Sequence, residues 1–231
     1  SRTIVGPESL RDAMIKKTQS ADVWPAKSFF EAKRDEQTAR HDKYYDIDYA
    51  LEPNVKTSPG GLRDIQTIAW IAKRYYKADT LADLVDLGFL TAQEYAQLVE
   101  GEHLLWKLRY GLHLLAGRKE DRLLFDKQKD LADLYGYKDD EKSLAVEKLM
   151  QEYYRAVANL RGLNDMLLQH FDEAILRAEV TEEITIINNR FQVRSDYIEI
   201  RNENVFKRFP FALIEIFVLM AQNPEIKGVR A

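Results

Sequence analysis

Between residues 142 and 177 the apolar side chains repeat with the period of an α-helix, and no proline interrupts the repeat. They recur at alternating steps of four and three residues, which places them on one face of a helix. The positions are Val146, Met150, Tyr153, Val157, Leu160, Leu167 and Phe171, with the polar Asn164 in the remaining place. A helix of this extent is roughly 50 Å long at 1.5 Å per residue. Because Asn164 and the tyrosines suit a mixed core, the pattern predicts the central helix of a bundle rather than a free coiled coil.

Shorter helical patterns lie on both sides of this segment. Glycine and proline contribute only 10 and 6 of the 231 residues, so few positions break a helix. One predicted helix begins at Thr91-Ala-Gln-Glu94, a capping box whose side chains satisfy free N–H groups, and it ends near Gly117. The full set of predicted shorter helices covers residues 7–18, 25–44, 62–76, 91–117, 127–135 and 210–222.

The pattern changes after Ala178. Short stretches alternate apolar and polar side chains there as strands do, around the turn residues Asn188-Asn189 and Ser195-Asp196. The predicted strands are residues 184–187, 191–193 and 197–200, and residues 49–56 also read as extended. The predicted fold class is therefore mainly α: a multi-helix bundle with a small β hairpin or ribbon near the C-terminus. We place a domain boundary near residue 179.

Charge and composition exclude several classes of protein. The chain has 34 Lys and Arg residues against 38 Asp and Glu, a net charge of −4, which argues against a nucleic-acid binder. With 45% apolar and 31% charged residues it is too apolar for disorder and too charged for a membrane protein. It has no cysteine, which excludes disulfides and thiolate metal sites and fits a reducing compartment. The first residue is not Met, and we expect a piece of a longer protein.

The first candidate site is the sequence EPNVKTSPGGLRD at residues 52–64. Gly60 and Gly61 precede a predicted helix, where glycine lets the backbone approach a ligand closely and the first N–H groups attract an anion. Lys56 and Arg63 add positive charge nearby. The alternative is a tight structural loop capped by Asp64, because the spacing matches neither a Walker loop nor a dinucleotide fingerprint.

The second candidate lies at the end of the helix predicted to stop near Gly117. Arg109 and His113 are four residues apart and therefore lie on one stripe, seven and eleven residues after Glu102. Polar groups on a helix with leucines on several faces must be paired or face a cleft. Two interpretations stay open: a satisfied internal network, or a phosphate-facing stripe that Arg118 and Arg122 extend beyond the helix end.

Other polar and aromatic groups have simpler explanations. His41-Asp42 suggests a metal phosphohydrolase, but such a site needs several further histidines and acids, and the remaining histidines lack the spacing of paired helical ligands. We therefore expect a surface dipeptide late in a helix and no metal site. Trp24, Trp70 and the Tyr153-Tyr154 pair are expected in the core rather than as stacking platforms for a ligand.

Several motifs together resemble a known family. They are LEPNVK at residues 51–56, SPGGLRDI at 58–65 and the spaced residues from Leu105-Trp106 to Phe125-Asp126, followed by YYR at 153–155, FDEAI at 171–175 and the FPF and EIF elements at 209–217. This combination resembles the bacterial protein-PII uridylyltransferase/uridylyl-removing enzymes over nearly the whole chain. A looser Gly-Gly-x-x-Asp-Ile element is shared with glutamine synthetase adenylyltransferase.

The resemblance implies a large cytoplasmic nitrogen sensor. In that family a nucleotidyltransferase domain moves UMP from UTP to a tyrosine of PII with Mg²⁺ held by carboxylates, a His-Asp-type hydrolase domain removes it, and ACT domains sense glutamine. By this resemblance residues 1–20 are the tail of the transferase core, residues 21–178 a helical linker or substrate-wall domain, and residues 179–231 a β ribbon and helix leading toward the hydrolase. The transferase metal motif would lie before Ser1 and the hydrolase histidines after Ala231.

Two functions follow from this placement. The segment either supplies the far wall of the transferase cleft or is a non-catalytic spacer and interaction module of a nucleotidyltransferase, such as the adenylyltransferase. In the first case Asp64 caps the helix or orients Arg63, and the segment alone is expected to be inactive, with no nucleic acid or membrane as a partner. The residues expected to face the triphosphate or the PII loop are Lys56, Gly60, Gly61, Arg63 and Asp64, with a second rim of Arg109, His113, Arg118 and Arg122.

Overall fold

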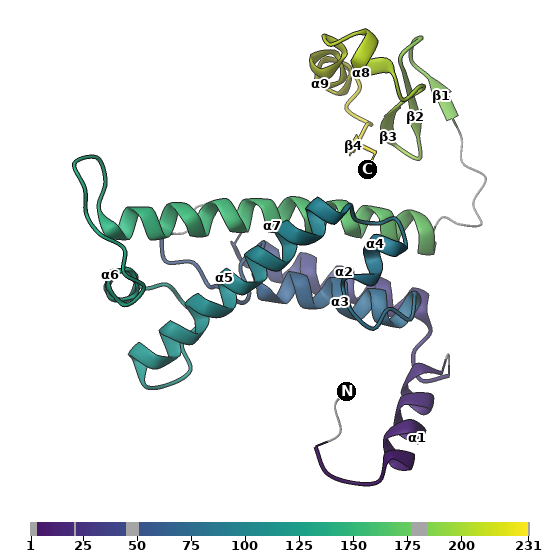
Figure 1. The fold of residues 1–231 in the computed structure, drawn as a ribbon. Coiled ribbons are helices and arrows are strands. Elements are labelled where there is room, and N and C mark those ends of the chain that lie inside the picture. The colour runs from purple at the N-terminus through teal and green to yellow at the C-terminus, as the bar shows by residue number, and fades with distance from the viewer. Residues whose placement is uncertain (1–3, 21, 45–50, 177–183, 231) are drawn as a thin grey trace. The chain divides into compact units, whose positions relative to one another are not determined.

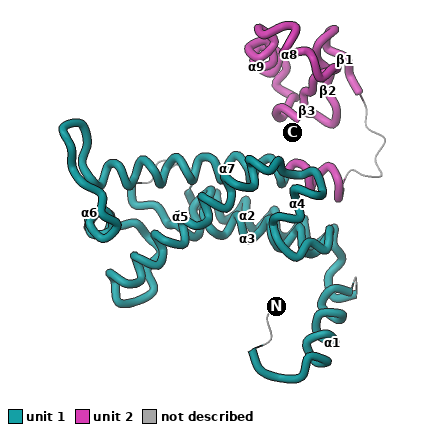
Figure 2. The backbone as a smooth tube through the Cα atoms, viewed as in Figure 1, with its two compact units in different colours: residues 1–168 teal, residues 169–231 magenta. Residues whose placement is uncertain are grey.

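The computed structural model describes residues 4–20, 22–44, 51–176 and 184–230, and their helices and strands are shown in Figure 1. The chain divides into two compact units, which we call unit 1 (residues 1–168) and unit 2 (residues 169–231) (Figure 2). The division falls inside a long helix, whereas the boundary predicted near residue 179 lies in 177–183, outside the described residues. The predicted fold class, mainly α with a small sheet near the C-terminus, is confirmed.

Unit 1 begins with two helices that each follow a proline. Helix α1 (Glu8–Gln19) follows Pro7, and α2 (Ala26–His41) follows Pro25 and continues into a 3₁₀ turn, η1 (Asp42–Tyr44). Each proline is the N-cap residue with a ψ of 141°, so the helix begins one residue after the predicted first helical position. No side chain of α1 is buried, whereas α2 packs against the next helix, α3.

Helix α3 (Leu62–Tyr75) buries the predicted apolar stripe, with Leu62, Ile65 and Ile68 each at most 5% exposed. A short helix, α4 (Asp83–Asp86), follows it and was not predicted. Helix α5 (Ala92–Ala116) has the predicted capping box at Thr91 and ends at Gly117 in the left-handed conformation, with φ of 62°. Both predicted ends of this helix are confirmed.

Helices α6 (Phe125–Leu134) and α7 (Ala145–Leu176) complete the bundle. The predicted core positions Tyr153, Leu160 and Leu167 of α7 are buried. Helix α5 approaches α7 closely at Gly101, where a Cβ would lie 2.9 Å from the Leu160 side chain. The small residue therefore sets how tightly the two longest helices of the bundle pack.

Not every predicted core aromatic residue is buried. Tyr153 is 1% exposed, as predicted, but Trp24 is 42% and Trp70 is 36% exposed. The prediction for the two tryptophans was wrong. Both lie at the edge of the α2–α3 pair, where their rings form the wall of a pocket rather than filling the space between helices.

Unit 2 contains a small sheet in the order β1-β2-β3-β4. Strands β1 (Ile184–Ile186), β2 (Phe191–Arg194) and β3 (Tyr197–Ile200) form the predicted antiparallel ribbon, and β4 (Gly228–Val229) adds to β3 in parallel. The predicted turn at Ser195 and Asp196 has positive φ at both residues, as a two-residue type I′ hairpin requires.

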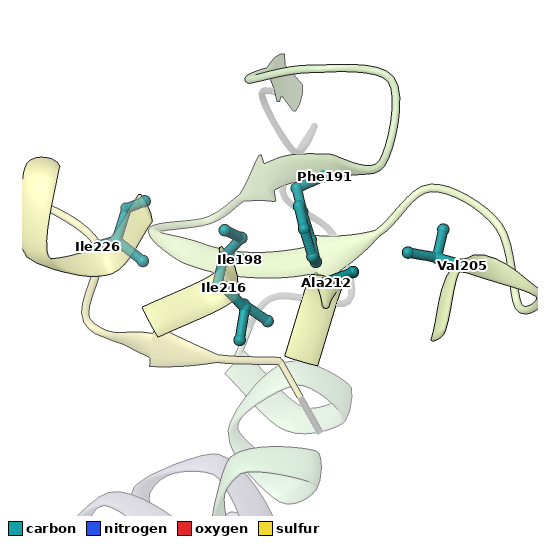
Figure 3. Packing of buried hydrophobic residues seen from close by; sticks show 6 residues of the cluster. All are labelled: Phe191, Ile198, Val205, Ala212, Ile216 and Ile226. Carbon is teal, nitrogen blue, oxygen red and sulfur yellow. The ribbon is translucent and has the colours of Figure 1, made fainter. Parts of the chain in front are cut away.

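Two helices cover this sheet: α8 (Val205–Arg208), which was not predicted, and α9 (Ala212–Gln222), which was. Sheet and helices share a small core, shown in Figure 3. Its members are Phe191, Ile198, Val205, Ala212, Ile216 and Ile226. In the part of the chain that the structure describes, no helix is both long enough and apolar enough to cross a membrane.

Candidate functional site

The loop that precedes α3 fixes its own conformation. The Asn54 side-chain oxygen accepts hydrogen bonds from the backbone N–H groups of Lys56 (3.0 Å) and Thr57 (2.9 Å), and the Gly61 N–H donates to the Ser58 carbonyl at 2.8 Å. Asparagine favours such turns because its side chain reaches the backbone two and three residues further on. Lys56 is thus held at a defined place just before the helix.

The two glycines of this loop pack against the protein itself. Gly60 has a φ of +75°, a conformation that favours glycine, and any side chain there would clash with the backbone carbonyl of Val157 on α7. At Gly61 a Cβ would lie 2.8 Å from the Ser58 carbonyl oxygen. Both glycines are buried. They allow a close contact between the loop and α7. Ligand binding at this loop is therefore indicated by the neighbouring cations and not by the glycines.

The buried Asp64 carboxylate binds the loop at residues 54–61. It is 1% exposed and accepts hydrogen bonds from the Gly60 N–H at 2.7 Å and from the Arg40 guanidinium at 2.9 Å. The His41 Nε2 atom lies 3.0 Å from the same carboxylate. Asp64 therefore ties the loop and α3 to the end of α2. His41 is half-buried against this carboxylate, which corrects the expectation of a surface dipeptide at His41-Asp42.

A short backbone pairing brings the second candidate region to the first. The Val55 N–H donates to the Asp121 carbonyl at 2.9 Å, and the Leu123 N–H donates to the Pro53 carbonyl at 2.8 Å. Asn54 forms an isolated antiparallel bridge with the residue after Asp121. Part of the stretch predicted as extended is thus paired; its residues 49 and 50 lie outside the described residues. The pairing places Lys56 beside the end of α5.

Asp121 contacts two polar side chains of α5. Its Oδ1 atom lies 2.8 Å from Arg109 Nε and 3.2 Å from His113 Nε2. Partial burial by itself would raise the pKa of Asp121, but the hydrogen bonds from Arg109 and His113 outweigh it and hold the pKa below its usual range. The predicted stripe of Arg109 and His113 is therefore anchored by one ionised carboxylate.

Lys56 and Arg63 add charge that this carboxylate does not neutralise. Burial and, secondly, the nearby Arg63 lower the pKa of Lys56, while Asp121 acts in the opposite direction. Among the described residues no carboxylate lies within ion-pair distance of either Lys56 or Arg63. Lys119, which the sequence analysis did not select, also acts on Lys56 as a like charge. We call Lys56, Arg63, Arg109, His113 and Lys119, with Asp121 among them, the cationic cluster.

Two further predicted cations are the sequence neighbours of Lys119 and Asp121. Arg118 and Arg122 are exposed, and Arg122 is 4.0 Å from the Glu52 carboxylate. Glu102 was placed on the stripe of Arg109, but it accepts a hydrogen bond from the Trp106 indole at 3.4 Å instead.

Sequence reasoning missed two residues that hold the candidate regions in place. The sequence analysis gave no role to Asp121 or to Arg40. Their positions carry a weak signal at best, because each becomes important only through a partner more than ten residues away. No group of three or more His, Cys, Asp or Glu side chains within the described ranges is arranged to hold a metal ion.

Comparison with known protein families identifies the chain. The model of the GlnD PII-uridylyltransferase family matches residues 28–168, which is more than half of the chain. The chain belongs to this family. A second family model, described as the uridylyltransferase GlnD third domain, matches residues 191–231. The first match contains the cationic cluster, and the second contains strands β2 to β4 with α8 and α9 of unit 2.

Relatives of the chain are bifunctional uridylyltransferase/uridylyl-removing enzymes. The protein of that name from Pseudomonas aeruginosa strain LESB58 is 58% identical over 230 residues, and those from Ectopseudomonas mendocina and Stutzerimonas stutzeri are 57% and 55% identical over 231 residues. In each case the whole chain is covered, but it spans only 26% of the relative. No solved structure matches the chain.

Proposed function

We propose that this chain is the helical segment of a cytoplasmic enzyme that uridylylates and deuridylylates PII, and that its cationic cluster completes the transferase cleft. The full-length enzyme would transfer UMP from UTP to PII and respond to glutamine at distant ACT domains. The observation that carries the role of this segment is the pair Lys56 and Arg63, two cations side by side without a carboxylate partner among the described residues.

The chemistry of the reaction calls for such a pair. Transfer of a nucleotidyl group concentrates negative charge on phosphate oxygens, and positioning together with charge neutralisation accounts for most of the catalysis. Fixed cations serve best because they need no reorganisation when the charge develops. The Asn54 turn fixes the backbone at Lys56, and Asp121 holds Arg109 and His113 behind it.

We infer that Mg²⁺ is held by another part of the enzyme. The described residues do not fit a metal site, since no group of suitable side chains converges among them. We propose that carboxylates of the nucleotidyltransferase domain hold Mg²⁺, where it would neutralise charge on the triphosphate. The residues of this chain would act beside it by binding and orienting phosphate oxygens.

The test is made in the full-length enzyme with Lys56→Ala and Arg63→Ala. Each variant is expected to lower kcat/KM for uridylylation of PII by about tenfold or more, because a cation that contacts the reacting phosphates is lost. Lys129→Ala, an exposed lysine on α6, is the matched control and is expected to keep normal rates. Rates equal to the control in correctly folded Lys56 and Arg63 variants would contradict the proposal.

The second candidate function is a spacer that couples two catalytic domains without touching substrate. Gly60 and Gly61 favour it, because both are buried against the chain itself. So does the pairing of Arg109 and His113 with Asp121. This function predicts that the Lys56 and Arg63 variants retain activity, so the same experiment separates the two candidates.

A further inference from the structure

A pocket of about 570 Å³ lies beside α3, one side of it formed by aromatic rings. Trp24, Phe29 and Trp70 line it, and the Trp24 and Phe29 rings meet edge to face with centroids 5.0 Å apart. The volume lies within the range of small-molecule sites, which are mostly apolar with a few polar groups. Both tryptophans are more than a third exposed, so part of each side chain is open to solvent. We call this cavity the tryptophan pocket.

Two cations lie over the Trp70 ring, and one of them, Lys33, lines the pocket itself. Lys33 Nζ lies 5.1 Å from the centre of the Trp70 ring, and the Arg63 guanidinium lies 5.2 Å from it. Lys73 and Asp79 also line the pocket, and they pair with each other at 3.4 Å. Neither Lys33 nor Arg63 has a carboxylate within ion-pair distance in the ranges that the structure describes. The site therefore combines flat apolar walls with cations that lack a counter-charge.

The wall is fixed before any ligand arrives. The Arg74 guanidinium donates hydrogen bonds to the backbone carbonyls of Thr18 (2.7 Å), Ser20 (2.8 Å) and Trp24. These contacts tie the C-terminal end of α1 and the Trp24 backbone to α3, and with them the Trp24 side of the pocket. A site whose walls are ordered in advance loses less entropy when it binds a ligand.

Arg63 joins the tryptophan pocket to the cationic cluster. Its guanidinium stacks on Trp70, and its charge also acts on Lys56. Arg63 and Trp70 are seven residues apart on α3, which is about 10 Å along the helix axis. A ligand with a planar ring against Trp70 and an anionic tail along Arg63 and Lys56 would fit both the tryptophan pocket and the cationic cluster. A nucleoside triphosphate has this arrangement of ring and charge.

We propose that the tryptophan pocket binds the base and ribose of the nucleotide whose phosphates contact Lys56 and Arg63. The proposal rests on the function proposed above and adds where the nucleoside end of the substrate lies. Bases stack on aromatic side chains regardless of sequence, since every base has a flat π face. Lys33 then lies beside the ring and contributes to the affinity for the anionic nucleotide.

The experiment uses the full-length enzyme with Trp70→Ala, Trp70→Phe and Lys33→Ala. KM for UTP, KM for PII and kcat are measured, and the Kd for UTP is measured by calorimetry. Trp70→Ala is expected to raise the Kd and the KM for UTP about tenfold while KM for PII is unchanged, because a stacking surface is lost. Trp70→Phe keeps a ring and should lose less. Lys27→Ala, on the exposed side of α2, is the control for Lys33→Ala and should match the parent enzyme.

Two outcomes would overturn the proposal. An increase in KM for PII with no change in the Kd for UTP would make the pocket a docking surface for the protein substrate. Unchanged constants in a Trp70→Ala enzyme with the unfolding temperature of the parent would show that the pocket takes no part. The two proposals fail separately: normal rates for Lys56→Ala and Arg63→Ala remove the phosphate site, whereas normal UTP affinity in Trp70→Ala removes only the nucleoside site.

Discussion

Two sets of side chains with the same composition occupy unit 1, and their surroundings differ. In one, Asp64 is bound by Arg40 and His41; in the other, Asp121 is bound by Arg109 and His113. The Asp64 side chain is 1% exposed and also accepts the backbone N–H of the Gly60 loop. The Asp121 side chain is 11% exposed, and its histidine partner is 34% exposed.

The difference lies in what surrounds each carboxylate. The Asp64 set is enclosed, and the carboxylate joins a loop and two helices, which is a structural role. The Asp121 set adjoins Lys56 and Lys119, so positive charge exceeds negative charge at a partly exposed surface. An Asp-Arg-His set therefore indicates function only when its exposure and its neighbouring charges are known.

The largest expected effect is on stability, from Asp64→Asn. The change leaves the Arg40 charge buried without its main partner and turns an amide donor toward the Gly60 N–H, at a cost of about 3–5 kcal/mol in free energy of unfolding. Urea unfolding followed by tryptophan fluorescence measures it, because all three tryptophans lie in unit 1. Glu36→Gln is the control: Glu36 also contacts Arg40 but is 44% exposed, so a loss below about 1 kcal/mol is expected. Equal losses would remove the distinction between the two sets.

A smaller effect is expected from Asp121→Asn, about 1–2 kcal/mol, because hydrogen bonds to a charged group are weakened at a partly exposed site. The pKa of Asp121 is lower in the folded chain than in the unfolded chain, so its stabilisation is complete above about pH 4 and is lost as the pH falls through the folded pKa. Urea unfolding at a series of pH values should show the difference between the parent and the variant shrinking toward acid pH. A difference that is constant with pH would contradict this account.

The smallest effect on stability is expected from Lys56→Met. Burial and Arg63 lower the pKa of Lys56, so its charged form destabilises the folded chain at neutral pH. This destabilisation disappears as the pH rises through the folded pKa, because Lys56 then loses its charge. Removing the charge should leave the free energy of unfolding within about 0.5 kcal/mol of the parent, in the stabilising direction. Lys129→Met provides the comparison. A clear loss of stability specific to Lys56→Met would make Lys56 a structural residue.

Much of the fold was predictable because it depends on local sequence. The alternating steps of four and three residues predicted α7, the Thr91-to-Glu94 capping box predicted the start of α5, and Ser195-Asp196 predicted the hairpin turn. Each signal acts within a few residues through the periodicity or the hydrogen bonds of the backbone. The short helices α4 and α8 have four residues each, too few for a periodic pattern to be detected.

The candidate site was predictable only in part. The sequence identified Lys56, Arg63, Arg109 and His113, because cations near a helix start and on one helical stripe are visible in the spacing. It did not give Asp121 its role or place Trp70 at the surface. Whether a tryptophan on an amphipathic helix is buried depends on which helix packs beside it, and spacing within one helix does not contain that information.

The amino-acid sequence alone determined the helices, the ribbon, the turns and the family resemblance, since periodicity, capping and motif identity are properties of neighbouring residues. Only the tertiary structure decided that residues 53–55 pair with residues 121–123, which brings Lys56 to Asp121 and separates the enclosed Asp64 from the partly exposed cluster. The physical reason is that charge and burial are set by atoms close in space, and here those atoms come from segments more than sixty residues apart.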